Sequence, residues 1–341
     1  MNKEIMRIGI KDVRGTRLYG ARRVGVHMDY IDSVKNRVHR VWHHYLDQWR
    51  TFSQTWCLRN NKISHGEIQN KRLIFYINHL DLQHIALLNE LFFDKMHPDL
   101  KILNMNWITL LTKIQSLLQI KEPEEQHFQA LQKIRNLAYT FEEDFHSKYD
   151  TGSMLLLDKL YQKDFSLLNE DDYYLFNTYM CVQYFRTKNR KKSFLAMQKD
   201  YPTVDILRIW NISSYMLASN MAFTIANDGY KHIFLENNTA INFITGDRPV
   251  INTYTGLEII NLLEYEPFEL YYPLTPKLAL LITRNDAFTH KSIYQLNEDD
   301  VYKYNDLIFK NSFEQVYSKE KSELYRYSVP MKPPYPLLYK I

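Results

Sequence analysis

The chain of 341 residues contains 45% hydrophobic and 24% charged residues, the proportions of a folded globular protein and not of a disordered, collagen-like or coiled-coil chain. Its two cysteines, Cys57 and Cys181, exclude a disulfide framework and a cysteine-based zinc site, and its net charge of +4 does not by itself indicate nucleic-acid binding. The charged opening lacks the apolar segment of a signal peptide, so we expect a cytoplasmic protein.

The chain is predicted to have two parts. Residues 1–30 form a basic arm with spaced glycines, since residues 1–50 hold eleven Lys and Arg against five Asp and Glu. Residues 31–341 form a single α+β domain, with a helical part at 31–228 and a part that contains the sheet at 229–341. Helices followed by strands predict a mainly helical region packed on a small, mostly antiparallel sheet, with a closing helix.

The helical part is expected to open with one helix and one hairpin. Apolar residues at helical spacing predict a helix over residues 29–46, whose core-facing side chains are those of Val41, Tyr45 and Leu46. Residues 51–65 are predicted to form a hairpin that turns at Asn60–Asn61. Further helices are expected at 80–94, 99–120, 123–147, 152–164, 169–187 and 204–227.

The last of these helices contains the most apolar stretch of the chain, residues 206–226. Its Arg and Asn residues indicate a buried helix and not a membrane span. After Gly229, short β-rich runs bounded by Asn, Asp, Gly and Pro predict strands at 231–236, 240–245, 268–272 and 278–283. A last helix is expected over residues 298–317, with one apolar face made by Val301, Tyr304, Leu307, Ile308 and Phe313.

Common enzyme motifs, such as a phosphate-binding loop, a dinucleotide fingerprint or a nucleophile elbow, do not occur in the sequence. His39 and His43 would share a helix face and could hold zinc together with Asp47, although structural histidines show the same spacing. The run Arg186–Lys192 contains five basic residues, which fit either a solvated helix end or a contact with phosphate.

The segment Asn242–Val250 predicts a strand that ends in a Thr-Gly-Asp turn before Pro249. Short polar residues at such a position either project into a cleft or hold a tight turn through hydrogen bonds to the backbone. Both interpretations stay open for Thr245 and Asp247.

Five phrases, spread along the chain in the order that the family has, resemble those of the domain-of-unknown-function 4238 family. The first phrase, H-x-V-x-x-x-Y-L-x-x-(F/W), is met by His39, Val41, Tyr45, Leu46 and Trp49. Q-x-x-R-T is met by Gln183, Arg186 and Thr187, and P-L-(S/T)-P by residues 273–276. F-(I/L)-T-S-D-x-P-V is met by residues 243–250 with Gly246 in place of the usual Ser, and an Asn in the final helix by Asn305. Trp42 also departs from the family, in which many members have Pro.

The resemblance covers about residues 39–310 and implies a role in bacterial anti-phage defence. If the phrases converge in space, one cleft collects His39, Arg186 and Asp247 as catalytic residues, with Gln183, Thr245 and Asn305 as substrate-binding residues. His39 would then act as a general acid or base, Arg186 as a phosphate clamp and Asp247 as the group that orients His39. A buried hydrogen-bond network that ties helices to the sheet would use the same residue types.

Two functions therefore follow from the sequence. The first is a defence effector with nuclease-like or phosphate-directed activity on nucleic acid, most simply a metal-independent nuclease. The alternative is a non-enzymatic sensor or binding module for a phage protein, a nucleotide or nucleic acid. The expected partners are RNA or DNA and a phage-encoded trigger, with no membrane. No cofactor is predicted, and a divalent metal held by His39 and Asp247 is the alternative.

Overall fold

The computed structural model describes residues 37–38, 43–66, 73–74, 80–94, 96–118, 152–165, 170–254 and 268–328, together with the helical positions 129, 132 and 133. The chain divides into two compact units, Met1–Val34 and Lys35–Ile341, and every described element belongs to the second. The predicted arm at 1–30 and most of the predicted helix at 123–147 lie outside the described residues.

The described helices are α2 (His43–Leu46), α3 (Leu82–Leu88), α4 (Pro98–Leu118), a helix over residues 152–161, α6 (Glu170–Phe185), α7 (Lys188–Leu195), α8 (Ile206–Asn227), α9 (Glu298–Asn311) and α10 (Ser322–Ser328). Tighter or wider turns continue three of them, at η1 (Asp47–Trp49), η2 (Asn89–Phe93) and η4 (Ala196–Lys199). The strands are β1 (Arg37–Val38), β2 (Thr55–Arg59), β3 (Lys62–Gly66), β4 (Leu73–Ile74), β5 (Lys231–Asn237), β6 (Thr245–Gly246), β7 (Ile251–Asn252), β8 (Leu270–Thr275), β9 (Leu278–Thr283), β10 (Ile293–Leu296) and β11 (Val316–Ser318). The α+β class is confirmed.

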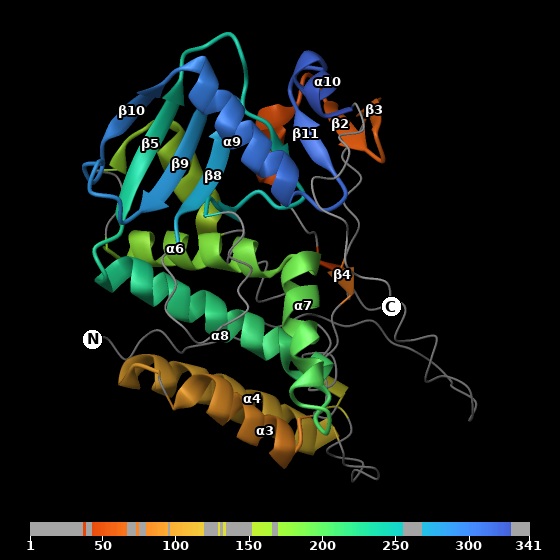
Figure 1. The fold of residues 1–341 in the computed structure, drawn as a ribbon. Coiled ribbons are helices and arrows are strands. Elements are labelled where there is room, and N and C mark those ends of the chain that lie inside the picture. The colour runs from red at the N-terminus through yellow and green to blue at the C-terminus, as the bar shows by residue number, and fades with distance from the viewer. Residues whose placement is uncertain are drawn as a thin grey trace. The chain divides into compact units, whose positions relative to one another are not determined.

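A five-stranded sheet in the order β10-β5-β9-β8-β7 forms the centre of this unit (Figure 1). Its pairs are antiparallel except for β10 with β5, which is parallel. Side chains alternate between two faces, as the pleat requires. On one face Phe234, Tyr272 and Leu280 join the core formed with α6 and α8, while on the other Ile233, Tyr271 and Leu281 pack with α9 and α10. Burial on both faces explains why these strands read as continuous apolar runs.

The predicted hairpin is present as β2 and β3 and turns where expected. Asn60 and Asn61 both have positive φ values, 50° and 58°, the conformation that a tight two-residue hairpin turn needs and that Asn tolerates. The hairpin also belongs to a second sheet, in the order β3-β2-β11-β6, whose other strands come from the C-terminal part. Helical and sheet regions are therefore less separate along the sequence than predicted.

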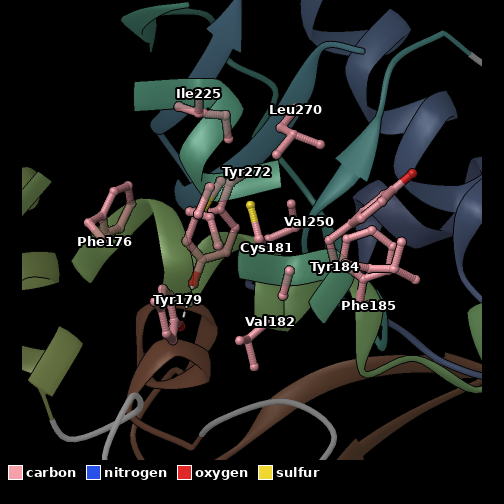
Figure 2. Close-up of a cluster of buried hydrophobic side chains, with 14 of the residues drawn as sticks. Phe176, Tyr179, Cys181, Val182, Tyr184, Phe185, Ile225, Val250, Leu270 and Tyr272 are labelled. Atoms are coloured by element: carbon pink, nitrogen blue, oxygen red, sulfur yellow. Dashed lines mark hydrogen bonds between the residues drawn. The ribbon is translucent and has the colours of Figure 1, made fainter. Parts of the chain in front are cut away.

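Helix α8 is buried along most of its length and packs against α6, as the sequence predicts for its apolar stretch. Figure 2 shows the neighbouring part of this core, where Phe176, Tyr179, Cys181 and Tyr184 project from α6 and Ile225 from α8. The Tyr179 hydroxyl lies 3.1 Å from that of Tyr272 on β8. Among the described helices, none is both long enough and apolar enough to cross a lipid bilayer.

The predicted helix over residues 29–46 is wrong at Arg37–Val38, which forms a strand paired with Leu73–Ile74. The described helix in this region is α2, over His43–Leu46. The inward direction of its side chains is confirmed for Tyr45 and Leu46, which are fully buried with Trp49, while Val41 lies outside the described residues.

The predicted strand at 240–245 is wrong, because side chains take the backbone groups that a neighbouring strand would pair. Asn237 donates to the carbonyl of Ile241, and Glu323 accepts from the backbone N–H of Asn242. Only Thr245–Gly246 pairs in a sheet, with β11. The segment is held in place by amides and a carboxylate and not by a ladder.

The closing helix ends at Asn311 and not at residue 317. Asp247 binds the backbone N–H groups of the two residues after Ser312, and Val316–Ser318 then pairs with β2 and β6. Those contacts compete successfully with one more helical turn. Of the predicted apolar face, Val301, Tyr304, Leu307 and Ile308 are buried, whereas Phe313, beyond the helix, is exposed.

Candidate functional site

The Thr-Gly-Asp turn lies where the chain passes from the four-stranded sheet at β6 to the five-stranded sheet at β7. The Tyr45 hydroxyl, from α2, donates to the Pro273 carbonyl at 2.7 Å and lies 2.7 Å from Thr245 Oγ1. Because the single phenolic proton is used toward Pro273, Thr245 donates to the Tyr45 oxygen. Burial holds the pKa of Tyr45 well above its ordinary value, so the phenol stays protonated. Thr245 therefore ties α2 to both sheets.

Asn305 of α9 has a similar structural role. Its Oδ1 accepts from the backbone N–H of Ile244 at 3.0 Å, and its Nδ2 donates to the carbonyl of Asn242 at 2.9 Å. The oxygen and the nitrogen of the Asn305 side-chain amide thus both hold the irregular segment that replaces the predicted strand. The side chain is 2% exposed, so these two backbone groups have no access to bulk water as a substitute.

Asp247 joins the turn to the loop that follows α9. Its Oδ1 accepts from the backbone N–H of Phe313 and its Oδ2 from that of Glu314, each at 2.8 Å. Its own backbone N–H donates to the Gln315 carbonyl at 2.9 Å. A carboxylate that accepts one backbone amide on each oxygen fixes the loop after α9 to the turn.

The remaining predicted site residues come from the end of α6 and from the segment before α2. Gln183 and Arg186 are both buried, in the last turn of α6 and directly after it. His39 lies outside the described residues, so its predicted contact with Asp247 and the zinc alternative with His43 and Asp47 have no described geometry. The structure brings Thr245, Asp247 and Asn305 together around one turn.

Next to that turn lie two arginines that were not among the predicted site residues. Arg190 of α7 donates through Nη2 to the hydroxyl of Tyr184, and its guanidinium lies 4.2 Å from the centre of the Tyr184 ring. Arg248, directly after Asp247, donates through Nη1 to the Asn311 carbonyl at 2.8 Å. We call Tyr184, Arg190 and Arg248 the arginine centre. Figure 2 shows Tyr184 at the end of α6, beside Phe185 and near Val250.

The charge of Arg190 acts on the neighbouring guanidinium group of Arg248. Burial and, to a smaller extent, the charge of Arg190 lower the pKa of Arg248 to about 10, while Tyr184 and Asp247 act in the opposite direction. Burial likewise raises the pKa of Tyr184, with partial compensation by Arg190 and Arg248. With a pKa of about 10, Arg248 remains protonated at neutral pH, so the site holds a buried positive charge.

Neither arginine has a full set of partners. Within the described part of the chain, no carboxylate forms an ion pair with Arg190 or Arg248. The Nε groups of both are buried and have no hydrogen-bond partner there. Buried guanidinium groups normally bind a carboxylate or a phosphate, so the centre has unused capacity for an anion.

The sequence contained a signal for each of these residues. Arg190 belongs to the basic run after α6, where phosphate contact was one of two interpretations, and Arg248 follows the Thr-Gly-Asp turn directly. What the sequence could not show is that the two segments meet. Among the described residues, no group of three His, Cys, Asp or Glu side chains gathers as a metal site would require.

Fold and site together define an α+β protein in which an arginine centre lies beside the turn that connects the four-stranded and five-stranded sheets. Residues 39–322 match the model of the family described as "Protein of unknown function (DUF4238)", and the chain belongs to this family. The family resemblance identified in the sequence is thus confirmed. No curated protein and no solved structure matches the chain.

Gly246, where the family phrase has Ser, is explained by close packing. A Cβ atom at this position would lie 2.0 Å from Ser312 Oγ, 3.2 Å from Ser312 Cβ and 3.2 Å from the Gln315 carbonyl. We expect Gly246→Ser to lower the free energy of unfolding by about 1–3 kcal/mol through overpacking, and Ser312→Gly to restore most of the loss in the double variant. Urea denaturation of the three variants measures this, and additive effects would contradict it.

Proposed function

We propose that the protein binds a phosphate-bearing ligand, a nucleotide or nucleic acid, at the arginine centre, and that this binding serves anti-phage defence in the bacterial cytoplasm. The observation that carries the proposal is the pair of guanidinium groups of the buried Arg248 and the half-buried Arg190, whose Nε donors are buried and have no described hydrogen-bond partner. Leaving charged donors unpaired in a buried site is costly, and a bound phosphate would offset that cost. The defence setting is what the family resemblance implies.

Binding is better supported than cleavage. A general acid or base must reach the proton that it transfers, whereas the described polar contacts of this turn serve the fold. Asp247 uses both oxygens on backbone amides, and the polar groups of Thr245 and Asn305 hold the turn. These contacts favour the sensor or binding module over the nuclease.

Phage plating with a matched pair of variants tests the proposal. We expect Arg190→Gln to reduce restriction of plating by about tenfold or more, the loss that follows from removing a charge-assisted hydrogen bond of about 1.5–3 kcal/mol. Arg284→Gln is the control, because Arg284 also lies over a tyrosine ring, that of Tyr230, but is exposed. Equal protection by both variants, at equal melting temperature, would contradict the proposal.

A second measurement separates binding from cleavage. Purified protein incubated with labelled RNA and DNA, with and without EDTA, should bind the nucleic acid and leave it at its full length. Retention should weaken in Arg190→Gln and not in Arg284→Gln. Products that accumulate with time in the parent and not in His39→Ala would instead establish the nuclease function.

A further inference from the structure

The arginine centre differs from an open phosphate-binding groove in its depth. Arg248 is 6% exposed and the Tyr184 side chain is 1% exposed, whereas Arg190, at the start of α7, is half-buried. The Nε of Arg248 is itself buried, so a ligand that reaches it must extend beneath the protein surface. Surface phosphate contacts, by contrast, use exposed Lys and Arg along the nucleic-acid backbone.

We infer that the group bound at this centre is a terminal phosphate, a phosphomonoester at the end of a nucleotide or nucleic-acid chain, and not an internal phosphodiester. An internal phosphodiester is flanked by sugars on both sides and cannot extend to a side chain as buried as Arg248 without the strand entering the protein. A monoester is attached at one side only and projects from the ligand. This inference rests on the proposed function and specifies its ligand.

Charge leads to the same assignment. The centre combines two guanidinium groups that lack carboxylate partners in the described part of the chain. Asp247, next to Arg248, already accepts one backbone amide on each oxygen. A monoester carries about −1.5 to −2 charges at neutral pH and offers three acceptor oxygens, whereas a diester carries one charge. The monoester is the better match to two guanidinium forks.

A third polar group lies one turn from Arg190. Thr187 precedes α7 in extended conformation, as a helix N-cap residue does, but its side chain does not cap the helix. Its hydroxyl is buried and has no hydrogen-bond partner among the described residues. Residues three apart at a helix start lie on one side of it, and helix N-termini favour phosphate groups. Thr187 is therefore a candidate to donate to the same phosphate as Arg190.

The test compares three single-stranded oligonucleotides of one sequence, with a 5′-phosphate, a 3′-phosphate or hydroxyls at both ends, by fluorescence anisotropy with the full chain. We expect at least one phosphorylated oligonucleotide to bind about tenfold or more tightly than the hydroxyl form. Inorganic phosphate should compete, and less well at pH 5.5 than at pH 7.5, since it takes up a proton and loses one negative charge between these two pH values.

Variants assign the effect to the centre. Arg248→Gln and Arg190→Gln should each remove the preference for the phosphorylated end, while Arg284→Gln should retain it. Arg248 also holds the Asn311 carbonyl, so its variant is compared at matched melting temperature, and Arg190→Gln provides a second measurement that does not disturb that contact. Thr187→Val should weaken only the phosphorylated form.

The outcomes distinguish this inference from the function on which it rests. Equal binding of all three oligonucleotides, lost in Arg190→Gln, overturns the terminal-phosphate assignment and leaves phosphate binding in place. Binding that is unchanged in both arginine variants, or no binding of any oligonucleotide or of phosphate, overturns both.

Discussion

Asp247→Ala is expected to lower the free energy of unfolding by about 3–5 kcal/mol, because it leaves two partly buried backbone N–H groups without their charged acceptor. These are the amides of Phe313 and Glu314, each 2.8 Å from one carboxylate oxygen. The variant also removes the negative charge next to Arg248, which raises the cost of that buried guanidinium. Chemical denaturation monitored by circular dichroism measures the change.

Asp247→Asn is the informative comparison. An amide has one acceptor oxygen, so one backbone N–H keeps its partner while the other faces the Nδ2 donor, and we expect a loss of about 1–3 kcal/mol. From the sequence alone this variant would keep the shape and lose only the charge; two amide contacts make it a structural change as well. Asp286→Ala, which removes an exposed ion pair with Lys231, should leave the denaturation midpoint unchanged. Two Asp247 variants as stable as the parent would refute this account of the turn.

Acidification should destabilise the fold through His232, which is buried on β5. Burial lowers its pKa from 6.5 to about 3, with smaller contributions from the nearby charges of His290 and Lys291. In the unfolded chain His232 therefore binds a proton below about pH 6.5, whereas in the folded chain it binds that proton only below about pH 3. The stability that comes from a neutral His232 is fully present above pH 6.5. It is lost as the pH falls, so the free energy of unfolding decreases by about 2 kcal/mol between pH 7 and pH 5.

The surroundings of the two ring nitrogens explain why folded His232 does not bind a second proton at pH 5. Its Nε2 lies 2.7 Å from Asn177 Oδ1 and therefore carries the ring proton, so a second proton would enter at Nδ1. That nitrogen is buried and has no described hydrogen-bond partner. Urea denaturation at pH 7 and pH 5 should show a smaller pH effect in His232→Gln than in the parent. His290→Gln, at a more exposed site, should keep most of it, and equal pH effects in all three proteins would contradict the assignment.

Those parts of the fold that follow from local patterns were predictable. The Asn60–Asn61 turn, the apolar stretch of α8 and the run 278–283 each carry their own signal, and the structure places all three as expected. The errors at 240–245 and after Asn311 have one common cause: long-range side-chain contacts from Asn305, Asp247 and Glu323. A contact between residues more than sixty positions apart leaves no periodicity in the sequence.

The candidate site was predictable only in part. Thr245, Asp247 and Asn305 were expected to lie together, and they do, but their hydrogen bonds serve the fold. Residue type cannot distinguish a carboxylate that holds two amides from one that orients a base. Arg190 and Arg248 could not be singled out, because only the fold brings the basic run after α6 to the residue that follows Asp247.

The pairing of β2 with β11 has a consequence for how the chain is made. The Thr55 hydroxyl donates to the carbonyl of Ser318, a residue 263 positions later. At about 5–20 residues per second, a ribosome needs roughly 15–50 seconds to synthesise the intervening chain. During that time β2 is an unpaired edge that other nascent chains could extend. We therefore expect messages that are cut before the codon for Val316 to yield aggregates, and dependence on holding chaperones to end only when β11 leaves the exit tunnel.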